Sequence, residues 1–297
     1  MGKRILISGA GGFIGTALST RLEQRGDEVV ALTRAPSGPG KVHWDPASGE
    51  LQSDEVEGFD AVVHLAGEPI AGLWTAKKKR AIIDSRREGT GLLAETLAGL
   101  EDPPKALISS SAIGIYGSRD DELLSESAGT GDGFLAEVVS TWEDSAEAAR
   151  DAGIRVVNLR LGLVTAESGG MMTPMKPAFK AGLGGRLGGG DQWWSWVTLD
   201  DVVKAFVHAV DTPEMTGPYN VVAPNPVTNA EFTKQLAGAL NRPAILPAPK
   251  FALKLVAREM ADEMLLASQR VDSSKLEDSG FEFGDPELRP ALERIFS

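Results

Sequence analysis

Continuous apolar runs alternate with helical patterns through the first 165 residues, and this alternation limits the possible folds more than any other feature. The runs lack polar alternation, as expected for parallel strands that helices cover on both faces. They fall at residues 4–8, 28–33, 60–66, 105–111 and 154–161. The helical patterns between them fall at residues 13–25, 75–99 and 133–152. The sequence therefore predicts an α/β fold with a doubly wound parallel sheet.

The composition of the sequence changes beyond residue 165, where glycine and proline become frequent and the predicted helices and strands become short. We therefore divide the chain into a sheet domain, 1–165, and a smaller C-terminal lobe, 166–297. A well-marked helix at 199–211 is expected to pack back onto the sheet domain. Three more helices are predicted in the lobe, and a small hairpin is predicted within 40–52. The three lobe helices are placed at 228–241, 250–266 and 286–296.

Composition excludes several classes of function. Thirty basic and 42 acidic residues give a net charge of −12, which repels nucleic acid and anionic membranes. The chain has no cysteine and only three histidines, without metal-binding spacing, so no metal site is expected. No apolar run is long enough to span a membrane or to serve as a signal peptide, which makes a cytoplasmic location the expectation.

Three glycines spaced by three, Gly9, Gly12 and Gly15, lie between the first strand and the first helix. Such glycines occur in flexible loops and in any tight strand-to-helix turn. In a strand–turn–helix context they also allow the backbone to approach a pyrophosphate, which the helix N-terminus then attracts. The motif predicts a Rossmann-type domain that binds a dinucleotide, although a purely structural turn that binds no nucleotide remains an alternative.

The end of the second strand indicates which dinucleotide. An acidic residue about 20 positions after the glycines would bind a ribose 2′-hydroxyl, but Thr33 and Arg34 occupy this place. An arginine at a strand end is commonly a surface residue. Its planar guanidinium also suits a 2′-phosphate, and together with the glycines it favours NADP(H) over NAD(H).

Arg86 falls among apolar residues on one face of the predicted helix 75–99. A buried arginine needs a partner. Spacing alone leaves two interpretations open: a salt bridge to a neighbouring carboxylate, or a contact with the cofactor beside the small Gly89.

The segments "ISGAGGFIG", "HLAG", "SSSAIGIYG" and "SWVTLDDV" resemble an extended short-chain dehydrogenase/reductase of the nucleotide-sugar epimerase type. The segments "SRREGTGLL", "FLAEVVSTWEDSA", "GLGGRLGGGDQWWSWVTLDDV" and "GFEFGDPELRPAL" resemble, more closely, an epimerase-family branch with a C-terminal domain of unknown function. The resemblance covers essentially the whole chain. One departure is Arg258-Glu259, where that branch usually has Gly-Glu.

The resemblance implies NADP(H) as the cofactor and assigns residues to it. The pyrophosphate would lie at Gly9, Gly12, Phe13, Ile14 and Gly15, and the 2′-phosphate at Thr33 and Arg34. Leu65, Ala66 and Gly67 would line the cofactor, Arg86 would contact it, and Val164 would lie near the nicotinamide. Related folds often dimerise through the helices placed at 75–99 and 133–152, so both a monomer and a homodimer are open.

The usual catalytic pair of this superfamily, a tyrosine and a lysine spaced YxxxK, is absent. The matching helix positions hold Phe134 and Val138 or Leu135 and Val139, which form an apolar stripe. This leaves Ser111 to orient a carbonyl. Tyr116 is the preferred proton donor, although a packed aromatic is the alternative interpretation of that residue.

Glu68, after "HLAG", is a second substitute for the missing acid and is placed in the substrate pocket; a helix-capping or solvated carboxylate is its alternative. The family pattern also places Gln192 and Trp196 in the substrate pocket, whereas a core-facing segment is the alternative. The sequence thus predicts an oxidoreductase or epimerase-like protein that uses NADP(H) and a small hydroxylated or sugar-like substrate. A noncatalytic protein that senses NADP(H) is the rival hypothesis.

Overall fold

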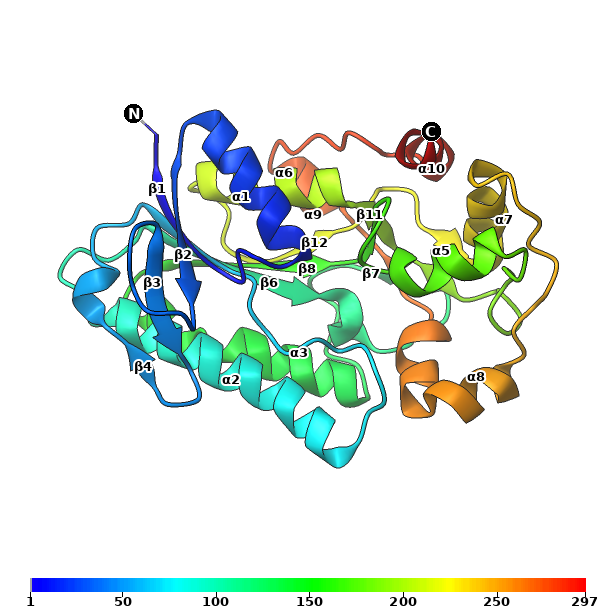
Figure 1. The fold of residues 1–297 in the computed structure, drawn as a ribbon, viewed down its shortest axis with the longest axis horizontal. Helices are drawn as coiled ribbons and strands as arrows, with labels where there is room; N and C mark the ends of the chain where they lie inside the picture. Colours follow the sequence, from blue (N-terminus) through cyan, green and yellow to red (C-terminus); the bar gives the residue numbers. More distant parts are fainter. Residues whose placement is uncertain (1) are drawn as a thin grey trace.

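The computed structural model describes residues 2–297 and contains a central eight-stranded sheet between two layers of helices (Figure 1). The strand order is β12-β8-β6-β5-β1-β2-β3-β4, and every neighbouring pair except β3–β4 is parallel. The five predicted runs form β1 (Arg4–Ser8), β2 (Glu28–Thr33), β5 (Ala61–His64), β6 (Ala106–Ala112) and β8 (Arg155–Leu161). Because the chain leaves β1 first to one side and later to the other, a crevice forms at its carboxyl end. The predicted fold class is confirmed.

At both edges the sheet extends beyond the strands predicted from the sequence. The predicted hairpin forms β3 (Lys41–Asp45) and β4 (Glu50–Leu51), and β3 also pairs in parallel with β2, so the hairpin extends the main sheet. At the other edge, β12 (Gly217–Val221) pairs in parallel with β8. The sheet therefore draws its last strand from beyond residue 165.

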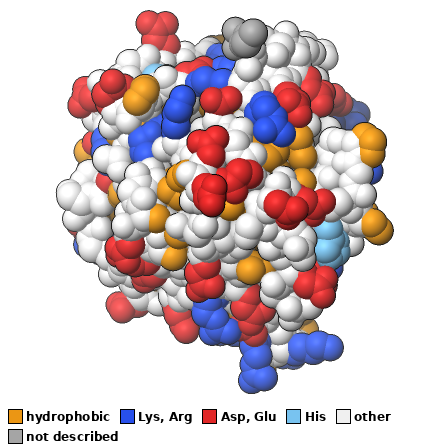
Figure 2. Space-filling model, turned by 90° about the vertical axis from the view of Figure 1, so that its left-hand side faces the viewer, with side chains coloured by type: hydrophobic (Ala, Val, Ile, Leu, Met, Phe, Trp, Pro, Cys, Tyr) orange, Lys and Arg blue, Asp and Glu red, His pale blue; other side chains and the backbone are white. Residues whose placement is uncertain are grey.

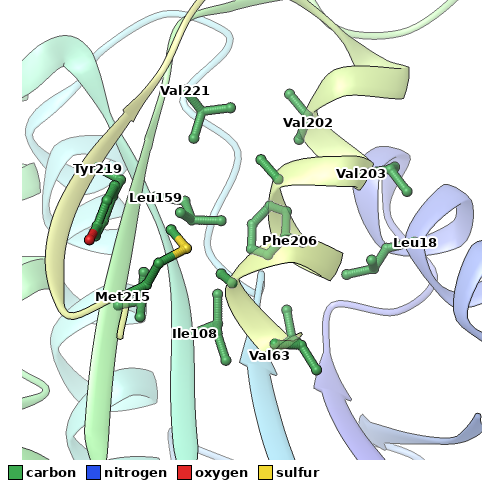
Figure 3. Packing of buried hydrophobic residues seen from close by; sticks show 14 of the residues in the cluster. Leu18, Val63, Ile108, Leu159, Val202, Val203, Phe206, Met215, Tyr219 and Val221 are labelled. Atoms are coloured by element: carbon green, nitrogen blue, oxygen red, sulfur yellow. The ribbon is translucent and has the colours of Figure 1, made fainter. Parts of the chain in front are cut away.

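Helices cover both faces of the sheet. On one face α1 (Phe13–Arg25) and α6 (Leu199–Asp211) pack side by side, so the helix at 199–211 does lie on the sheet. Figure 3 shows Phe206 of α6 facing Leu159 and Ile108 of the sheet, with Leu18 of α1 on its other side. The other face carries α2 (Ala76–Ala98), α3 (Phe134–Asp144) and α4 (Glu147–Asp151).

The predicted helix 133–152 is divided into α3 and α4. Ser145 donates a hydrogen bond from its hydroxyl to the Thr141 carbonyl at 2.6 Å. A serine that bonds to the carbonyl four residues earlier bends a helix at that point. The bend turns Ala146 and Ala149 into the core beneath the sheet.

The C-terminal lobe has its own small core, in which Trp194 and Trp196 pack against α7 (Asn229–Ala239) and α10 (Leu288–Phe296). The predicted helix 250–266 stops early: α8 (Lys250–Ala257) ends at Arg258, whose φ is +52°. A π-helical turn, Ala261–Leu265, follows. The remaining helices are α5 (Met172–Lys180) and α9 (Ser274–Asp278), with short 3₁₀ turns at Ser53–Glu55 and Ile113–Tyr116. The remaining strands are β7 (Leu123–Leu124), β9 (Leu163–Thr165), β10 (Trp193–Trp194), β11 (Trp196–Thr198), β13 (Val227–Thr228) and β14 (Arg270–Val271).

Candidate functional site

The turn between β1 and α1 is shaped by its three glycines. Gly9 has a φ of +72°, and a Cβ there would lie 2.9 Å from the backbone nitrogen of Ala66. A Cβ on Gly15 would lie 2.1 Å from the Gly9 carbonyl oxygen. Both positions therefore exclude any side chain. By contrast, a Cβ on Gly11 would meet no atom within 4 Å, so the turn is open on its outer side.

The first turn of α1 has no negative charge to balance its helix dipole. Gly12 provides no side-chain cap, and no acidic residue occurs in the first turn, which holds Phe13, Ile14 and Gly15. Unpaired N–H groups and a positive dipole at an uncapped N-terminus favour a bound anion. The pyrophosphate position at this end of α1 stays a prediction.

Two adjoining hollows of about 450 and 580 Å³ lie beside this turn, at the carboxyl ends of β1, β2 and β5. They share Gly9, Gly12, Arg34, Trp44 and Ala66 in their walls. The structure thus brings together most of the predicted cofactor residues and Glu68. The predicted residues that line one or both hollows are Gly9, Gly12, Thr33, Arg34, Leu65, Ala66, Gly67 and Glu68.

The smaller hollow carries two basic side chains, Arg34 after β2 and Lys41 at the start of β3. Within residues 2–297 neither forms a salt bridge or a side-chain hydrogen bond. Two exposed basic side chains without an acidic partner thus lie in one hollow. Sequence reasoning missed Lys41 because the pairing of β3 with β2, which brings it there, is not visible in local periodicity.

A series of buried hydrogen bonds through Ser8, His64 and Thr90 supports the loop after β5. The Ser8 hydroxyl oxygen accepts hydrogen bonds from the backbone N–H groups of Leu65 and Ala66, at 3.1 and 3.3 Å. Its own proton is then directed to His64 Nδ1, 2.6 Å away, and His64 Nε2–H donates to the Thr90 hydroxyl at 3.0 Å. Burial, with a smaller contribution from the Arg86 charge, lowers the pKa of His64 to about 4, so its ring is neutral.

Arg86 lies behind the same loop. Its Nη1 donates to the carbonyls of Glu68 and Ile82, at 3.0 and 3.1 Å, and the guanidinium stacks on Trp142 at 4.7 Å. The Glu68 carboxylate pairs instead with Lys78, at 2.6 Å. Burial lowers the pKa of Arg86 to about 10, against the opposing charge of Glu68.

These contacts bear on the two interpretations of Arg86, a salt bridge to a neighbouring carboxylate and a contact with the cofactor, but do not decide between them. Of its nitrogens, Nε is buried without a hydrogen-bond partner among the described residues. A Cβ on Gly67 would lie 3.3 Å from the guanidinium carbon, so only glycine fits there comfortably. Arg86 thus supports the loop that lines the larger hollow; its direct contact with a cofactor stays a prediction.

The structure places Ser111 and Tyr116 in a buried polar network rather than on the two hollows. Ser111 donates to Glu143 Oε1 at 2.5 Å, and Arg160 binds both oxygens of Glu143 at 2.8 Å. The Tyr116 hydroxyl donates to Asn220 Oδ1 at 2.7 Å and accepts from Arg160 Nη1 at 3.0 Å. Tyr116 is fully buried. Burial raises its pKa above the usual value, although Arg160 opposes this shift.

This network could not be predicted from the sequence because its members come from β6, the 3₁₀ turn Ile113–Tyr116, β8, β12 and α3. The apolar stripe at the YxxxK positions agrees with expectation, since Phe134 and Val138 are buried together and Val139 packs near Tyr116.

Three predicted residues lie in different surroundings. Gln192 donates to the carbonyls of Leu187 and Leu265 and lines a hollow of about 330 Å³ between the C-terminal lobe and the loop that holds Ser118 and Asp120. Trp196 is fully buried, donates from Nε1 to the Asn225 carbonyl, and does not reach this hollow. Alternation along the segment turns Trp194 and Trp196 into the core, and Trp193 lines the hollow instead.

Phe13 and Val164 lie outside the two cofactor hollows. Phe13 lines a separate hollow of about 490 Å³, and a Cβ on Gly169 would lie 2.4 Å from its ring. Val164 pairs with Val197 in the two-stranded β9–β11 sheet. No group of His, Asp and Glu residues within 2–297 is arranged to hold a metal ion. None of the helices in the described part of the chain combines the length and apolarity of a membrane span.

Comparison with known proteins agrees with the Rossmann-type fold described above. Residues 5–222 match the NAD dependent epimerase/dehydratase family, and residues 248–295 match a domain of unknown function, DUF1731. The chain belongs to the NAD dependent epimerase/dehydratase family. The predicted family, with its C-terminal domain of unknown function, is therefore confirmed.

Members of this family resemble the chain over its whole length. The epimerase family protein Mb2239 of Mycobacterium bovis is 40% identical over 97% of this chain and 96% of its own length. The crystal structure of human epimerase family protein SDR39U1 with NADPH has a TM-score of 0.90 and 35% identity, covering 98% of each chain. A Corynebacterium glutamicum protein described as a nucleoside-diphosphate sugar epimerase has a TM-score of 0.83 and 35% identity. All of this chain and 58% of that one are aligned.

Proposed function

We propose that this family member binds NADP(H) across the carboxyl ends of β1, β2 and β5. The observation that carries the proposal is the pair of free cations, Arg34 and Lys41, in the hollow beside the open glycine turn. A 2′-phosphate placed between them forms charge-assisted hydrogen bonds that a 2′-hydroxyl cannot. The NADPH-bound structure of the human relative supports this choice of cofactor.

The cofactor proposal predicts distinct results for the two cations. Arg34→Asp should weaken NADPH binding by at least about a hundredfold, because it removes a favourable charge and adds a repulsive one. Lys41→Ala should weaken it by about tenfold, and both variants should change NADH binding little. Isothermal titration calorimetry measures these affinities, with Lys105→Ala as a control at an exposed basic site. Equal losses for NADPH and NADH would show that this hollow does not hold the 2′-phosphate.

We further propose an oxidoreductase or epimerase-like activity on a small hydroxylated or sugar-like substrate. When bound, the cofactor supplies or accepts the hydride, and the protein must exchange a proton with the substrate oxygen. Of the two sequence candidates for this proton transfer, Glu68 lines the larger hollow, whereas Tyr116 is enclosed. We assign the exchange to Glu68, whose carboxylate lies on this hollow and pairs with the Lys78 ammonium at 2.6 Å.

Two variants distinguish these candidates. Glu68→Gln should lower turnover by about a hundredfold while NADPH affinity is kept, because the amide cannot exchange a proton. Tyr116→Phe should lower stability but leave turnover close to that of the wild type. The measurement is NADPH oxidation with D-glyceraldehyde and dihydroxyacetone as probes of a hydroxylated carbonyl substrate. Abolished turnover in Tyr116→Phe alone would instead make Tyr116 the donor.

One observation favours the rival function, a noncatalytic protein that senses NADP(H). The positions of the usual tyrosine and lysine are apolar and packed, with Phe134 and Val138 buried against Ile82. If neither the probes nor a wider panel of carbonyl compounds and sugar nucleotides is turned over while NADPH still binds, the sensor is the better description.

A further inference from the structure

Exposed apolar side chains gather at α8, in the C-terminal lobe and at the end of the molecule opposite β3 and β4 in Figure 1. Of the nine large apolar side chains that are exposed within residues 2–297, six lie on α8 or on the two loops beside its start, and three lie elsewhere. Phe251, Leu255 and Val256 on α8 are 75, 80 and 79% exposed. We call this region the α8 surface. Its apolar members are Leu183, Ile245, Leu246, Phe251, Leu255 and Val256.

The α8 surface is continuous and open. The backbone N–H of Leu246 donates to the Gly184 carbonyl at 3.4 Å, and that of Ala248 donates to the Arg186 carbonyl at 2.9 Å. These bonds hold the loop that contains Leu183 beside the loop that leads into α8. The helix itself contains no buried residue. Its apolar side chains are therefore accessible to a partner, and a group of exposed apolar side chains of this kind marks an interaction site.

Basic side chains accompany these apolar ones. Residues 168–190 and 242–258, which contain the α8 surface, hold seven basic residues and no acidic one. These residues contribute +7 to the net charge of −12, so the rest of the chain carries −19. On α8 itself Lys250 and Lys254 lie four residues apart, and therefore on one side of the helix, next to Phe251 and Leu255 at the same spacing. The exposed part of α8 thus has a basic flank beside an apolar face.

Most of these cations lack an acidic partner. Lys254 pairs with Asp262 at 2.8 Å, and Glu259 pairs with Lys79 at 2.6 Å, so these two carboxylates are already neutralised within the chain. The α8 surface therefore combines exposed apolar groups with unneutralised positive charge, and it complements an occupant that is both apolar and anionic. Five exposed basic residues in the two segments form no salt bridge within residues 2–297: Lys180, Arg186, Arg242, Lys250 and Arg258.

We propose that the α8 surface binds the surface of an anionic phospholipid bilayer. Phe251, Leu255 and Val256 enter the boundary between headgroups and acyl chains, and the unpaired lysines and arginines meet the lipid phosphates. A helix with a basic flank and an exposed apolar face is typical of such interfacial contacts. A bilayer adapts to apolar side chains that project from a protein, whereas a protein partner must offer a groove of matching shape. An acidic protein partner is therefore the second occupant to test.

The negative net charge of the chain does not oppose this contact. At physiological ionic strength, screening limits the interaction between exposed charges to about 8 Å. The acidic side chains in Figure 2 lie on the end of the molecule that carries β3 and β4, away from α8 in Figure 1. Only charge close to the bilayer contributes to binding, and there the chain is basic. The repulsion of anionic membranes expected from composition thus applies to the rest of the surface and not to this face.

Flotation of the full chain with lipid vesicles tests the proposal. The wild type should float with vesicles of equimolar phosphatidylcholine and phosphatidylserine but not with phosphatidylcholine alone, and added salt should release it. Leu255→Glu should lower the partition into the anionic vesicles at least about tenfold. Leu123→Glu, at an apolar side chain that is 56% exposed outside the α8 surface, is the matched control and should float like the wild type. A wild type that does not float, or a control that loses as much binding as Leu255→Glu, would overturn the proposal.

A double variant tests the contribution of charge. Lys250→Glu/Arg258→Glu should lower the partition at least about tenfold, because each cation near an anionic surface strengthens binding several-fold. Lys105→Glu/Lys234→Glu, at basic side chains that are 87 and 81% exposed elsewhere, is the matched control. NADPH affinity should be the same in every variant, so failure of this proposal is distinct from failure of the cofactor proposal. Equal losses in the two double variants would contradict a contact through the α8 surface.

The lack of cysteine in the chain allows insertion to be measured with a single label. Val256→Cys, labelled with nitrobenzoxadiazole, should shift its emission to the blue on the anionic vesicles, because the label enters the apolar layer. Leu123→Cys, labelled in the same way, should not. No shift at position 256, or the same shift at both positions, would contradict insertion of α8. If the wild type leaves the vesicles unbound but binds a labelled peptide of alternating glutamate and leucine through Leu255, an acidic protein partner replaces the bilayer.

Discussion

Ser8, His64 and Thr90 show how single side chains shape the cofactor site without lining it. The Ser8 hydroxyl fixes the two amides that follow β5, and His64 fixes the direction of the Ser8 proton. Thr90 on α2 completes the chain, at 3.0 Å from His64 Nε2. Each member depends on a neutral imidazole, because a protonated ring could not accept the proton of Ser8.

This dependence predicts a loss of stability in acid. The unfolded chain binds a proton at His64 below the usual pKa of 6.5, whereas the folded chain does so only near 4. Stability should therefore fall as the pH drops from about 6.5 to about 4, by up to roughly 3 kcal/mol from this group. Urea unfolding of the wild type and His64→Gln across this range measures the difference.

His43→Gln is the control, since His43 is partly exposed and its ring contacts only the Ala35 carbonyl and the Glu50 carboxylate. Its acid dependence should follow that of the wild type. If His64→Gln loses as much stability as the wild type between pH 6.5 and pH 4, the buried neutral imidazole does not govern the acid response.

At the scale of elements, α3 receives its N-terminal cap from the C-terminal lobe. The Glu263 carboxylate accepts hydrogen bonds from the backbone N–H groups of Phe134 and Leu135, at 2.9 and 2.7 Å. Gly133, with a φ of +110°, lets the carboxylate approach: a Cβ there would lie 3.0 Å from the Glu263 carboxyl carbon. The π-helical turn that follows α8 thus joins the lobe to the sheet domain.

Glu263→Gln should therefore destabilise the protein by about 1–2 kcal/mol, because the amide keeps one acceptor but loses the charge at the helix N-terminus. Glu259→Gln is the matched control: Glu259 pairs with Lys79 at the surface, where loss of the charge should have little effect. Thermal unfolding measures both variants. Equal losses of stability from the two substitutions would mean that the capping contact stabilises the protein no more than the surface ion pair of Glu259 does.

The elements also show what the sequence can predict. The strands, α1 and the glycine turn follow from local periodicity and from glycines that no other residue can replace, as at Gly15. Contacts between distant segments leave no such local pattern. Lys41 reaches the cofactor hollow only because β3 joins the sheet, and Glu143 meets Ser111 only through the packing of α3 on β6.

At the scale of the whole molecule, the proposed cofactor site lies in the sheet domain. One hollow is bordered by the glycine turn, the uncapped start of α1, Arg34 after β2 and Lys41 at the start of β3. In the C-terminal lobe, α7 and α8 lie at the other end of the molecule from β3 and β4 (Figure 1). The central claim is that the hollow selects a dinucleotide by its 2′-phosphate.

The most direct test of this claim is calorimetric titration of the wild-type chain with NADPH and, separately, with NADH. We propose that Arg34 and Lys41 interact with the one group in which these ligands differ, the 2′-phosphate. The account predicts that NADPH binds at least about a hundredfold more tightly than NADH, and that 2′-AMP competes with it. Equal affinities, or no binding of either ligand, would contradict it.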